Sequence, residues 1–191
     1  MEKTREKLSR MLSEREVSGI LGLRLNHGHP TPFLFTRPEE LKDLIVDEVN
    51  RYPLTKILIK IAKKHPDGVF GIVVRGCEER SLVELIKNFQ LRQEKVKVIG
   101  IPCSQELANR CRCDRPFPSQ VEEGEMAKPA EDFSDIDEIE KLPEEERFQY
   151  WMGQFGKCIK CYGCRNICPA CFCPTCTLED ANLIKPGGMP P

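Results

Sequence analysis

Seven cysteines within residues 158–176 constrain this chain more than any other feature of its sequence, and we call this stretch the ferredoxin-type run. The first four are spaced Cys-x2-Cys-x2-Cys-x3-Cys and precede a proline; they are Cys158, Cys161, Cys164 and Cys168. This is the bacterial ferredoxin pattern for a [4Fe–4S] cluster, in which the fourth cysteine commonly serves a second cluster. Two intervening residues let the chain curl around a cubane, so that successive thiolates reach different irons.

The second half of the run departs from a ferredoxin repeat, because its remaining cysteines are Cys171, Cys173 and Cys176. A two-cluster ferredoxin would carry eight cysteines in two full repeats. Either one cluster forms here beside spare thiols, or two form with one ligand from elsewhere, and we favour two. Zinc is the rival metal, since two Cys-x2-Cys pairs can also bind it through four thiolates. Zinc ribbons usually separate their pairs by about a dozen residues or more, which this run does not.

The composition excludes several classes of protein. The 191 residues include 29 basic and 30 acidic side chains, for a net charge of −1, so no overall field recruits nucleic acid or an anionic membrane. No apolar run approaches the roughly 20 residues of a membrane span. The N-terminus is charged and lacks an apolar signal region, so we expect a cytoplasmic protein. In that compartment, eleven cysteines indicate metal or redox chemistry rather than disulfides.

Residues 54–101 predict a βαβ unit. Residues 54–64 and 78–91 have the apolar period of helices, the second through Leu82, Leu85, Ile86 and Phe89. Residues 69–74 and 96–101 are continuous apolar runs, typical of strands buried on both faces of a parallel sheet. The fold class is therefore α/β, with a small parallel sheet followed by a ferredoxin-like iron–sulfur segment.

The residues before this unit predict further elements. We expect a helix over 2–16 with Leu8, Met11 and Leu12 on one side, and two short strands, 18–25 and 33–36, joined by a turn over 26–32. A helix over 37–50 follows, with Thr36 as its N-cap. His27 and His29 are interpreted as exposed turn residues rather than ligands.

Four cysteines outside the run are expected at one edge of the sheet, and we call them the strand-end cysteines: Cys77, Cys103, Cys111 and Cys113. The first two follow neighbouring strands, and ligands of open α/β sheets bind beyond the carboxyl ends of strands. Four thiolates are the ligand set of a cubane cluster. The sequence therefore predicts a metal site, the alternative being that the first two are merely small buried residues.

Arginines flank the strand-end cysteines, namely Arg75, Arg110, Arg112 and Arg115. Their charge would offset that of thiolate-bound iron, although a solvated basic loop would have the same composition.

We expect three parts in all. Residues 1–115 form the α/β domain with the cysteine site at its strand ends, and 143–191 form the ferredoxin-type segment and tail. Between them, 116–142 form an extended acidic linker with little helix, long enough to wrap the domain. A helix starting at Pro143 leads into the run. It carries aromatic and apolar side chains that either shield a cluster or pack as core: Phe148, Tyr150, Trp151, Met152 and Phe155.

The stretch from about Leu21 to Cys113 resembles the beta-subunit family of coenzyme F-420-dependent hydrogenases and dehydrogenases. The motifs that carry the resemblance are residues 35–41, 50–56, 73–82 and 99–103. The C-terminal segment is similar to ferredoxin-type segments of anaerobic electron-transfer complexes. The resemblance implies an iron–sulfur flavoprotein that hands electrons to a soluble carrier. This sequence is shorter than full-length members of the family and has extra cysteines, so we expect a shortened, cysteine-rich member.

We therefore expect an iron–sulfur electron-transfer subunit with two to three [4Fe–4S] clusters. It would relay single electrons between a catalytic partner and another carrier, in a complex of the hydrogenase, formate dehydrogenase or heterodisulfide-reductase type. The sequence has three histidines and no evident catalytic triad, so we do not expect an enzyme in its own right. One alternative is an oxidoreductase subunit that uses FAD to reduce a deazaflavin or similar carrier. The other is a zinc-binding interaction module.

Overall fold

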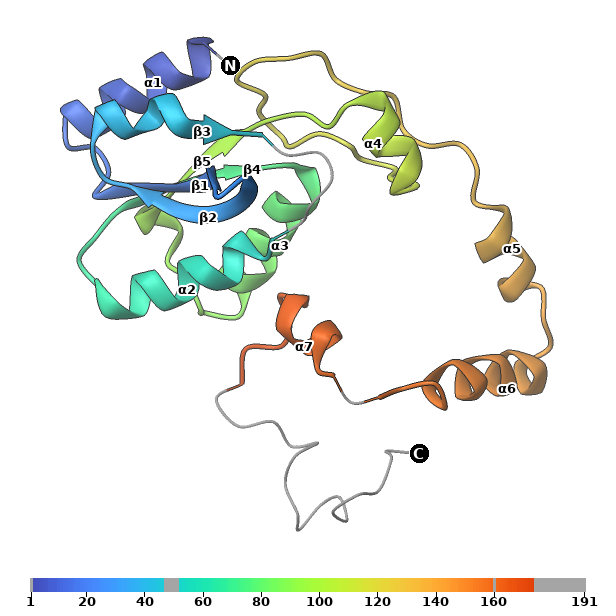
Figure 1. Ribbon diagram of the computed structural model, residues 1–191. Coiled ribbons are helices and arrows are strands. Elements are labelled where there is room, and N and C mark those ends of the chain that lie inside the picture. The colour runs from blue at the N-terminus through green and yellow to red at the C-terminus, as the bar shows by residue number, and fades with distance from the viewer. Residues whose placement is uncertain (1, 47–51, 160, 174–191) are drawn as a thin grey trace. The chain divides into compact units, whose positions relative to one another are not determined.

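The fold is mixed α/β, built on one small sheet. The computed structural model describes residues 2–46, 52–159 and 161–173 (Figure 1). The strands are β1 (Gly19–Asn26), β2 (His29–Phe35), β3 (Leu44–Ile45), β4 (Phe70–Val74) and β5 (Val96–Gly100). Their order is β2-β1-β4-β5, with β3 also paired to β1. The β1–β4 and β4–β5 pairs are parallel, and β2 and β3 pair with β1 in the antiparallel sense.

Helices cover both faces of this sheet (Figure 1). The α-helices of the first part of the chain are α1 (Glu2–Ser13), α2 (Leu54–Lys64), α3 (Gly76–Lys87) and α4 (Gln105–Arg110); the 3-10 helices are η1 (Pro38–Asp43) and η2 (Gln93–Lys95). Apolar residues of α1 and η1 share one buried core with residues of β1, β2, β4 and β5. Helices α2 and α3 pack against strands β1, β4 and β5.

Strand β4 confirms the prediction made from its apolar run, because all five of its residues are buried. The prediction that residues 96–101 form a strand buried on both faces is wrong for the first half of β5. Strand β5 is the last strand in the order, so only one of its edges is paired, and its first half is partly open to solvent, with Val98 40% exposed.

The β1–β2 turn is shorter than the expected 26–32. It consists of His27 and Gly28, whose φ angles of 49° and 78° are typical of a type I′ turn. Strand β2 therefore includes Pro30 and Pro32. Both are tolerated because β2 lies at the edge of the sheet, where a missing N–H breaks no ladder. Both histidines of this hairpin are exposed.

The helix expected over 37–50 is wrong beyond its first turns, since η1 ends at Asp43. Leu44 follows as a fully buried residue of β3, so burial of that side chain and pairing with β1 end the helix. Residues 47–50 lie outside the described part. Thr36 is not the N-cap; that residue is Arg37.

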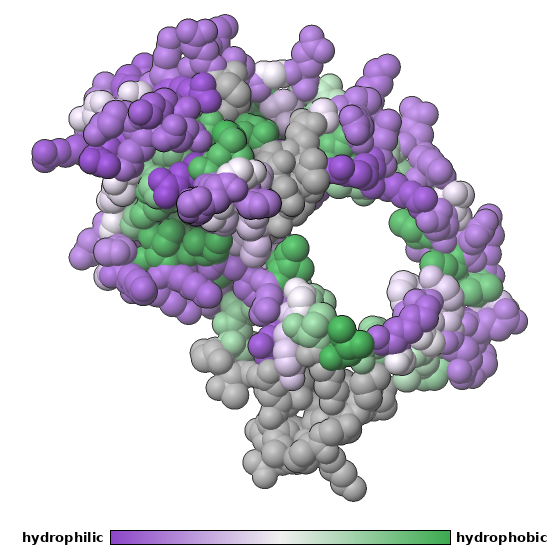
Figure 2. Space-filling view, in the orientation of Figure 1, coloured by the Kyte–Doolittle hydropathy of each residue, from purple (hydrophilic) through white to green (hydrophobic). Residues whose placement is uncertain are grey.

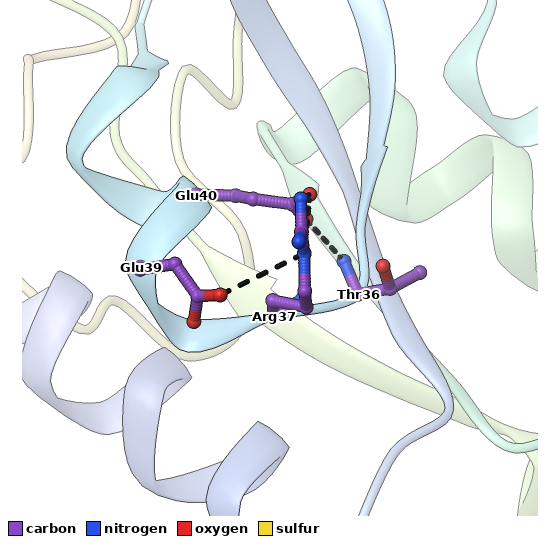
Figure 3. Close-up of polar contacts among 4 residues, drawn as sticks. All are labelled: Thr36, Arg37, Glu39 and Glu40. Carbon is purple, nitrogen blue, oxygen red and sulfur yellow. Dashed lines mark hydrogen bonds and ion pairs between the residues drawn. The ribbon is translucent and has the colours of Figure 1, made fainter.

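The side chain of Glu40 caps the N-terminal end of η1. Its carboxylate accepts the backbone N–H groups of Thr36, at 2.9 Å, and of Arg37, at 3.1 Å, and pairs with the Arg37 guanidinium at 2.7 Å (Figure 3). The Thr36 hydrogen bond and then the Arg37 side chain hold the pKa of Glu40 below its ordinary value.

Helix α3 begins earlier and ends earlier than the predicted 78–91. Cys77 therefore lies in its first turn rather than in a loop. Phe89 is not on the helical face as predicted. Its φ is 56° and its side chain is 93% exposed, which places it in the chain reversal after the helix. Helix α4 was not predicted; the Ser104 hydroxyl caps it by accepting the N–H of Leu107 at 3.2 Å.

Residues 115–123, which we call the covering segment, lie across the carboxyl ends of β4 and β5. The N–H of Glu122 donates to the carbonyl of Gly100 at 3.0 Å, so the covering segment is hydrogen-bonded to the last residue of β5. Glu122 also pairs with Lys7 of α1, and Thr4 donates to Glu123 through its N–H, at 3.1 Å, and its hydroxyl. The first part of the expected linker thus wraps the α/β unit.

The chain divides into two compact units. One comprises Met1–Glu131 with Ile167–Ala170, and the other Asp132–Asn166 with Cys171–Pro191. The second contains α5 (Ser134–Glu140) and α6 (Glu144–Phe155), and α7 (Gly163–Ile167) follows. Helix α5 corrects the expectation of little helix before Leu142, while α6 begins directly after Pro143 as predicted. The division into parts 1–115, 116–142 and 143–191 concerns independent folding and stays a prediction.

The visible surface of the α/β unit is mostly hydrophilic, with apolar residues between the charged side chains (Figure 2). No helix in the described residues is long and apolar enough to cross a membrane.

We predict that Gly100→Ala destabilises the α/β unit by about 1–3 kcal/mol or more, as overpacking does. A Cβ here would collide with the carbonyl oxygen of Gln120 in the covering segment and lie 2.6 Å from Pro118 Cγ. Gly153→Ala in α6 is the matched control, since nothing lies within 4 Å of its Cβ. Denaturant unfolding measures both variants, and equal stability would contradict the packing described.

We also predict that Glu40→Gln removes a pH-dependent part of stability. Because folding lowers the pKa of Glu40, its contribution is complete above the unfolded pKa and is lost as pH falls through the lower, folded value. The difference in unfolding free energy between wild type and variant should therefore be constant above about pH 5 and shrink below it. Glu39→Gln serves as the control, and a difference that grows on acidification would refute the cap.

Candidate metal centre

Two of the strand-end cysteines follow paired strands at the same offset. Val74 and Gly100, the last residues of β4 and β5, are register partners in the parallel pair. Cys77 follows the first strand and Cys103 the second, each three residues on (77 − 74 and 103 − 100). Because parallel strands end at one edge of a sheet, the fold places both cysteines there.

All four strand-end cysteines line a single pocket. Cys77 and Cys111 are exposed, Cys113 is half-buried, and Cys103 is 9% exposed. Other residues of the wall come from the start of α2, from α3 and from α4, including Tyr52, Leu54, Thr55, Ser81, Leu107 and Ala108. The structure thus brings together the four residues singled out by sequence, while their role as metal ligands stays a prediction.

Backbone hydrogen bonds fix the loops that carry three of these cysteines. The N–H of Cys103 donates to the Pro116 carbonyl at 2.9 Å. The N–H of Cys111 donates to Leu107 and that of Cys113 to Ala108, both at 3.0 Å, which closes the end of α4. These bonds hold residues 111–113, which we call the Cys-x-Cys loop, against α4. They also hold one end of the covering segment against the loop after β5.

A close backbone approach joins α3 to the covering segment. A Cβ at position 76 would collide with the carbonyl oxygen of Phe117 and lie 2.7 Å from that of Arg115. Only glycine permits the approach without displacing the chain. Glu79 of α3 reinforces it, since its carboxylate accepts the N–H of Ser119 at 2.7 Å and also the Ser119 hydroxyl.

The cations around the pocket are not the full set expected from sequence. Arg75, Arg112 and Arg115 line it, whereas Arg110 is not among the described lining residues. Sequence reasoning missed Arg80, whose Nη2 lies 3.8 Å from Cys113 Sγ and whose Nη1 donates to the Arg115 carbonyl at 3.2 Å. The helical spacing from Cys77 to Arg80, i to i+3, is the signal that would have found it.

The donor set of this pocket fits an iron–sulfur cluster. It offers four sulfur ligands. Positively charged residues outnumber negatively charged ones in its wall, with four arginines and three acidic residues: Glu78, Glu84 and Asp114. Among the described residues, no group of three or more His, Cys, Asp or Glu side chains is placed to hold a metal ion. Ligation at this pocket would therefore require the thiols to turn toward one another.

The ferredoxin-type run begins where α6 ends, with the N–H of Cys158 donating to the Phe155 carbonyl at 3.0 Å. Cys161 precedes α7 and Cys164 lies within it, and a positive φ of 59° at Tyr162 turns the chain between them. The six described cysteines of the run are exposed except Cys168, which is half-buried. Cys176 lies outside the described residues.

The aromatic side chains of α6 do not form a core within the described structure. Phe148, Trp151 and Phe155 are 55%, 46% and 60% exposed, and no residue of the helix is buried. Of the two roles expected for them, core packing is not seen, and shielding of a cluster stays a prediction.

Comparison with known proteins shows similarity over part of the chain. No family model matches the sequence. The chain is 45% identical over 69 residues to the F420-dependent formate dehydrogenase 1 subunit beta of Methanococcus maripaludis, covering 36% of this chain and 17% of that protein. It is 41% identical over 66 residues to the F420-dependent formate dehydrogenase subunit beta of Methanocaldococcus jannaschii, covering 35% and 17%.

Both matches support the resemblance to the beta-subunit family over about a third of the chain. The aligned stretch spans only 17% of the length of each of these curated relatives.

We predict that the strand-end cysteines differ in reactivity in the metal-free protein. Buried Cys103 should alkylate at least about tenfold more slowly than exposed Cys77, a ratio that corresponds to about 1.4 kcal/mol of local opening. Timed anaerobic alkylation followed by peptide mass spectrometry measures both rates in one sample. Denatured protein provides the control, in which the rates should converge; equal rates in the native protein would contradict the described burial.

Proposed function

We propose that this chain is an electron-transfer subunit of an oxidoreductase complex and that it relays single electrons through [4Fe–4S] clusters. The observation that carries the proposal is the arrival of four cysteines at one pocket from a helix start and two separate loops. The ferredoxin spacing of the C-terminal run supports it independently. The relatives named above, which are beta subunits of formate dehydrogenases, support a place in a redox complex.

The residues divide into two sets in this proposal. The strand-end cysteines would hold one cluster. The ferredoxin-type run would hold one or two more, with Cys158, Cys161 and Cys164 as common ligands of one of them, and with the remaining four as ligands of a second: Cys168, Cys171, Cys173 and Cys176. A bound cluster supplies the one-electron chemistry, and the protein holds it, controls its access to water and adjusts its potential.

A second candidate function is a flavin-containing subunit that reduces a deazaflavin carrier. The relatives named above, which are beta subunits of F420-dependent formate dehydrogenases, favour it. Protein purified under anaerobic conditions and precipitated with acid would release a flavin with its characteristic absorbance if this function holds. The same sample without released flavin would leave the electron relay as the function.

We predict that anaerobically purified protein contains at least about eight irons and an equal amount of sulfide, the content of two cubanes. Replacing Cys158, Cys161 and Cys164 by serine should remove about four irons. Replacing Cys77 and Cys103 by serine should remove about four others and leave the rest, because the proposal assigns the two sets to different clusters. Iron and sulfide assays, with EPR spectra of the reduced protein, measure each variant.

Three outcomes would overturn this account. One is a wild-type protein with fewer than about four irons per chain, the content of a single cubane. Another is zinc without iron or sulfide, which would establish the zinc-binding module. The third is an unchanged iron content after replacement of Cys77 and Cys103, which would limit the relay to the C-terminal run.

A further inference from the structure

Arg80 joins two parts of the candidate centre through one guanidinium group. Its Nη2 lies 3.8 Å from the sulfur of Cys113, and its Nη1 donates to the carbonyl of Arg115 at 3.2 Å. The two groups that it contacts are two residues apart in the loop leading into the covering segment. The planar fork of arginine suits such a double contact, whereas the ammonium of lysine does not.

The helix that carries Arg80 also carries another strand-end cysteine. Cys77 and Arg80 are three residues apart in α3, so they lie on neighbouring positions of one helical face. Arg80 therefore fixes the position of the Cys113 loop relative to the helix turn that holds Cys77. The adjacent Glu79 binds Ser119 further along the covering segment, so consecutive residues of α3 hold the start and the middle of that segment.

The charge of Arg80 is not used in a salt bridge within the described residues, where the ion pairs involve other arginines and lysines. Its two polar contacts are a carbonyl oxygen and a cysteine sulfur. A structural role alone would explain the carbonyl contact. It would not explain why the second arm of the fork is directed at sulfur.

We propose that Arg80 is a positioning residue that holds Cys113 in the pocket and raises the reduction potential of a cluster bound there. This inference rests on the proposed function. Reduction adds negative charge to a thiolate-ligated cluster, and an N–H donated to a ligating sulfur stabilises that charge. The effect of Arg80 is local, because its donor contacts the Cys113 sulfur itself. The inference requires the guanidinium to keep this contact when the thiols turn toward one another to bind the cluster.

The chain offers a control for general charge. Arg115 lines the same pocket and carries the same charge, but its contact with Arg80 is through its backbone carbonyl. Arg115→Met therefore removes one positive charge from the wall and leaves the hydrogen bond to Cys113 in place. Arg80→Met removes both the charge and the hydrogen bond, and Arg80→Lys keeps the charge while losing the fork.

The experiment uses the 191-residue chain with all seven cysteines of the ferredoxin-type run replaced by alanine, so that any iron belongs to the strand-end cysteines. Iron and sulfide are quantified, and the midpoint potential is measured by anaerobic titration followed by EPR. We expect about four irons per chain in this background, the content of one cubane, and in Arg115→Met. Arg80→Met should shift the midpoint potential to a more negative value than Arg115→Met does, and Arg80→Lys should fall between Arg80→Met and the background.

The positioning role has its own readout, which applies if Arg80→Met binds iron poorly. Loss of iron from Arg80→Met but not from Arg115→Met, with equal thermal unfolding of the metal-free proteins, would support it, and the potential would then be read from Arg80→Lys. Equal iron content and equal potentials in Arg80→Met and Arg115→Met would overturn the inference while leaving the proposed function intact. A background protein without iron or sulfide would overturn the strand-end cluster itself, and with it this role of Arg80.

Discussion

The candidate centre depends on one backbone packing arrangement, in which the covering segment crosses the carboxyl ends of β4 and β5. Two glycines permit it, because a side chain at Gly76 or at Gly100 would collide with carbonyl oxygens of that segment. The hydrogen bond between Cys103 and Pro116 ties the loop after β5 to the same segment. Without this close contact, the loops that carry the cysteines would not be held together by the covering segment.

This packing sets the chemical character of the pocket. It places one buried thiol, that of Cys103, and one half-buried thiol, that of Cys113, beside two exposed ones. A group bound there would have one side in the protein and one toward solvent, an arrangement that suits electron exchange with a partner because the ligands on the outer side are accessible. Arginines on the wall supply positive charge where thiolates would supply negative charge, and Arg80 directs that charge at an individual sulfur.

Sequence reasoning succeeded where one local pattern determines the result. The unbroken apolar run of β4 predicted a strand covered on both faces, and the position of Cys77 and Cys103 after two parallel strands predicted their meeting at one edge. It failed where distant residues decide. The helix expected over 37–50 has suitable local residues, but Leu44 is buried in the core and pairs with β1, which ends the helix early. Strand β5 has the composition of a buried strand and lies at an edge.

The sequence by itself determined the chemistry available to this protein: cysteines in ferredoxin spacing, further cysteines after two strands, and near-neutral charge. Ligand type and spacing are local properties, so they can be read without a fold. Only the tertiary structure decided which residues of the expected linker pack on the domain, namely 115–123, and that Arg80 rather than Arg110 lines the candidate centre. Those outcomes depend on which glycines leave room for a distant backbone and on which helical face meets the Cys-x-Cys loop. Both are set by packing between segments far apart in the sequence.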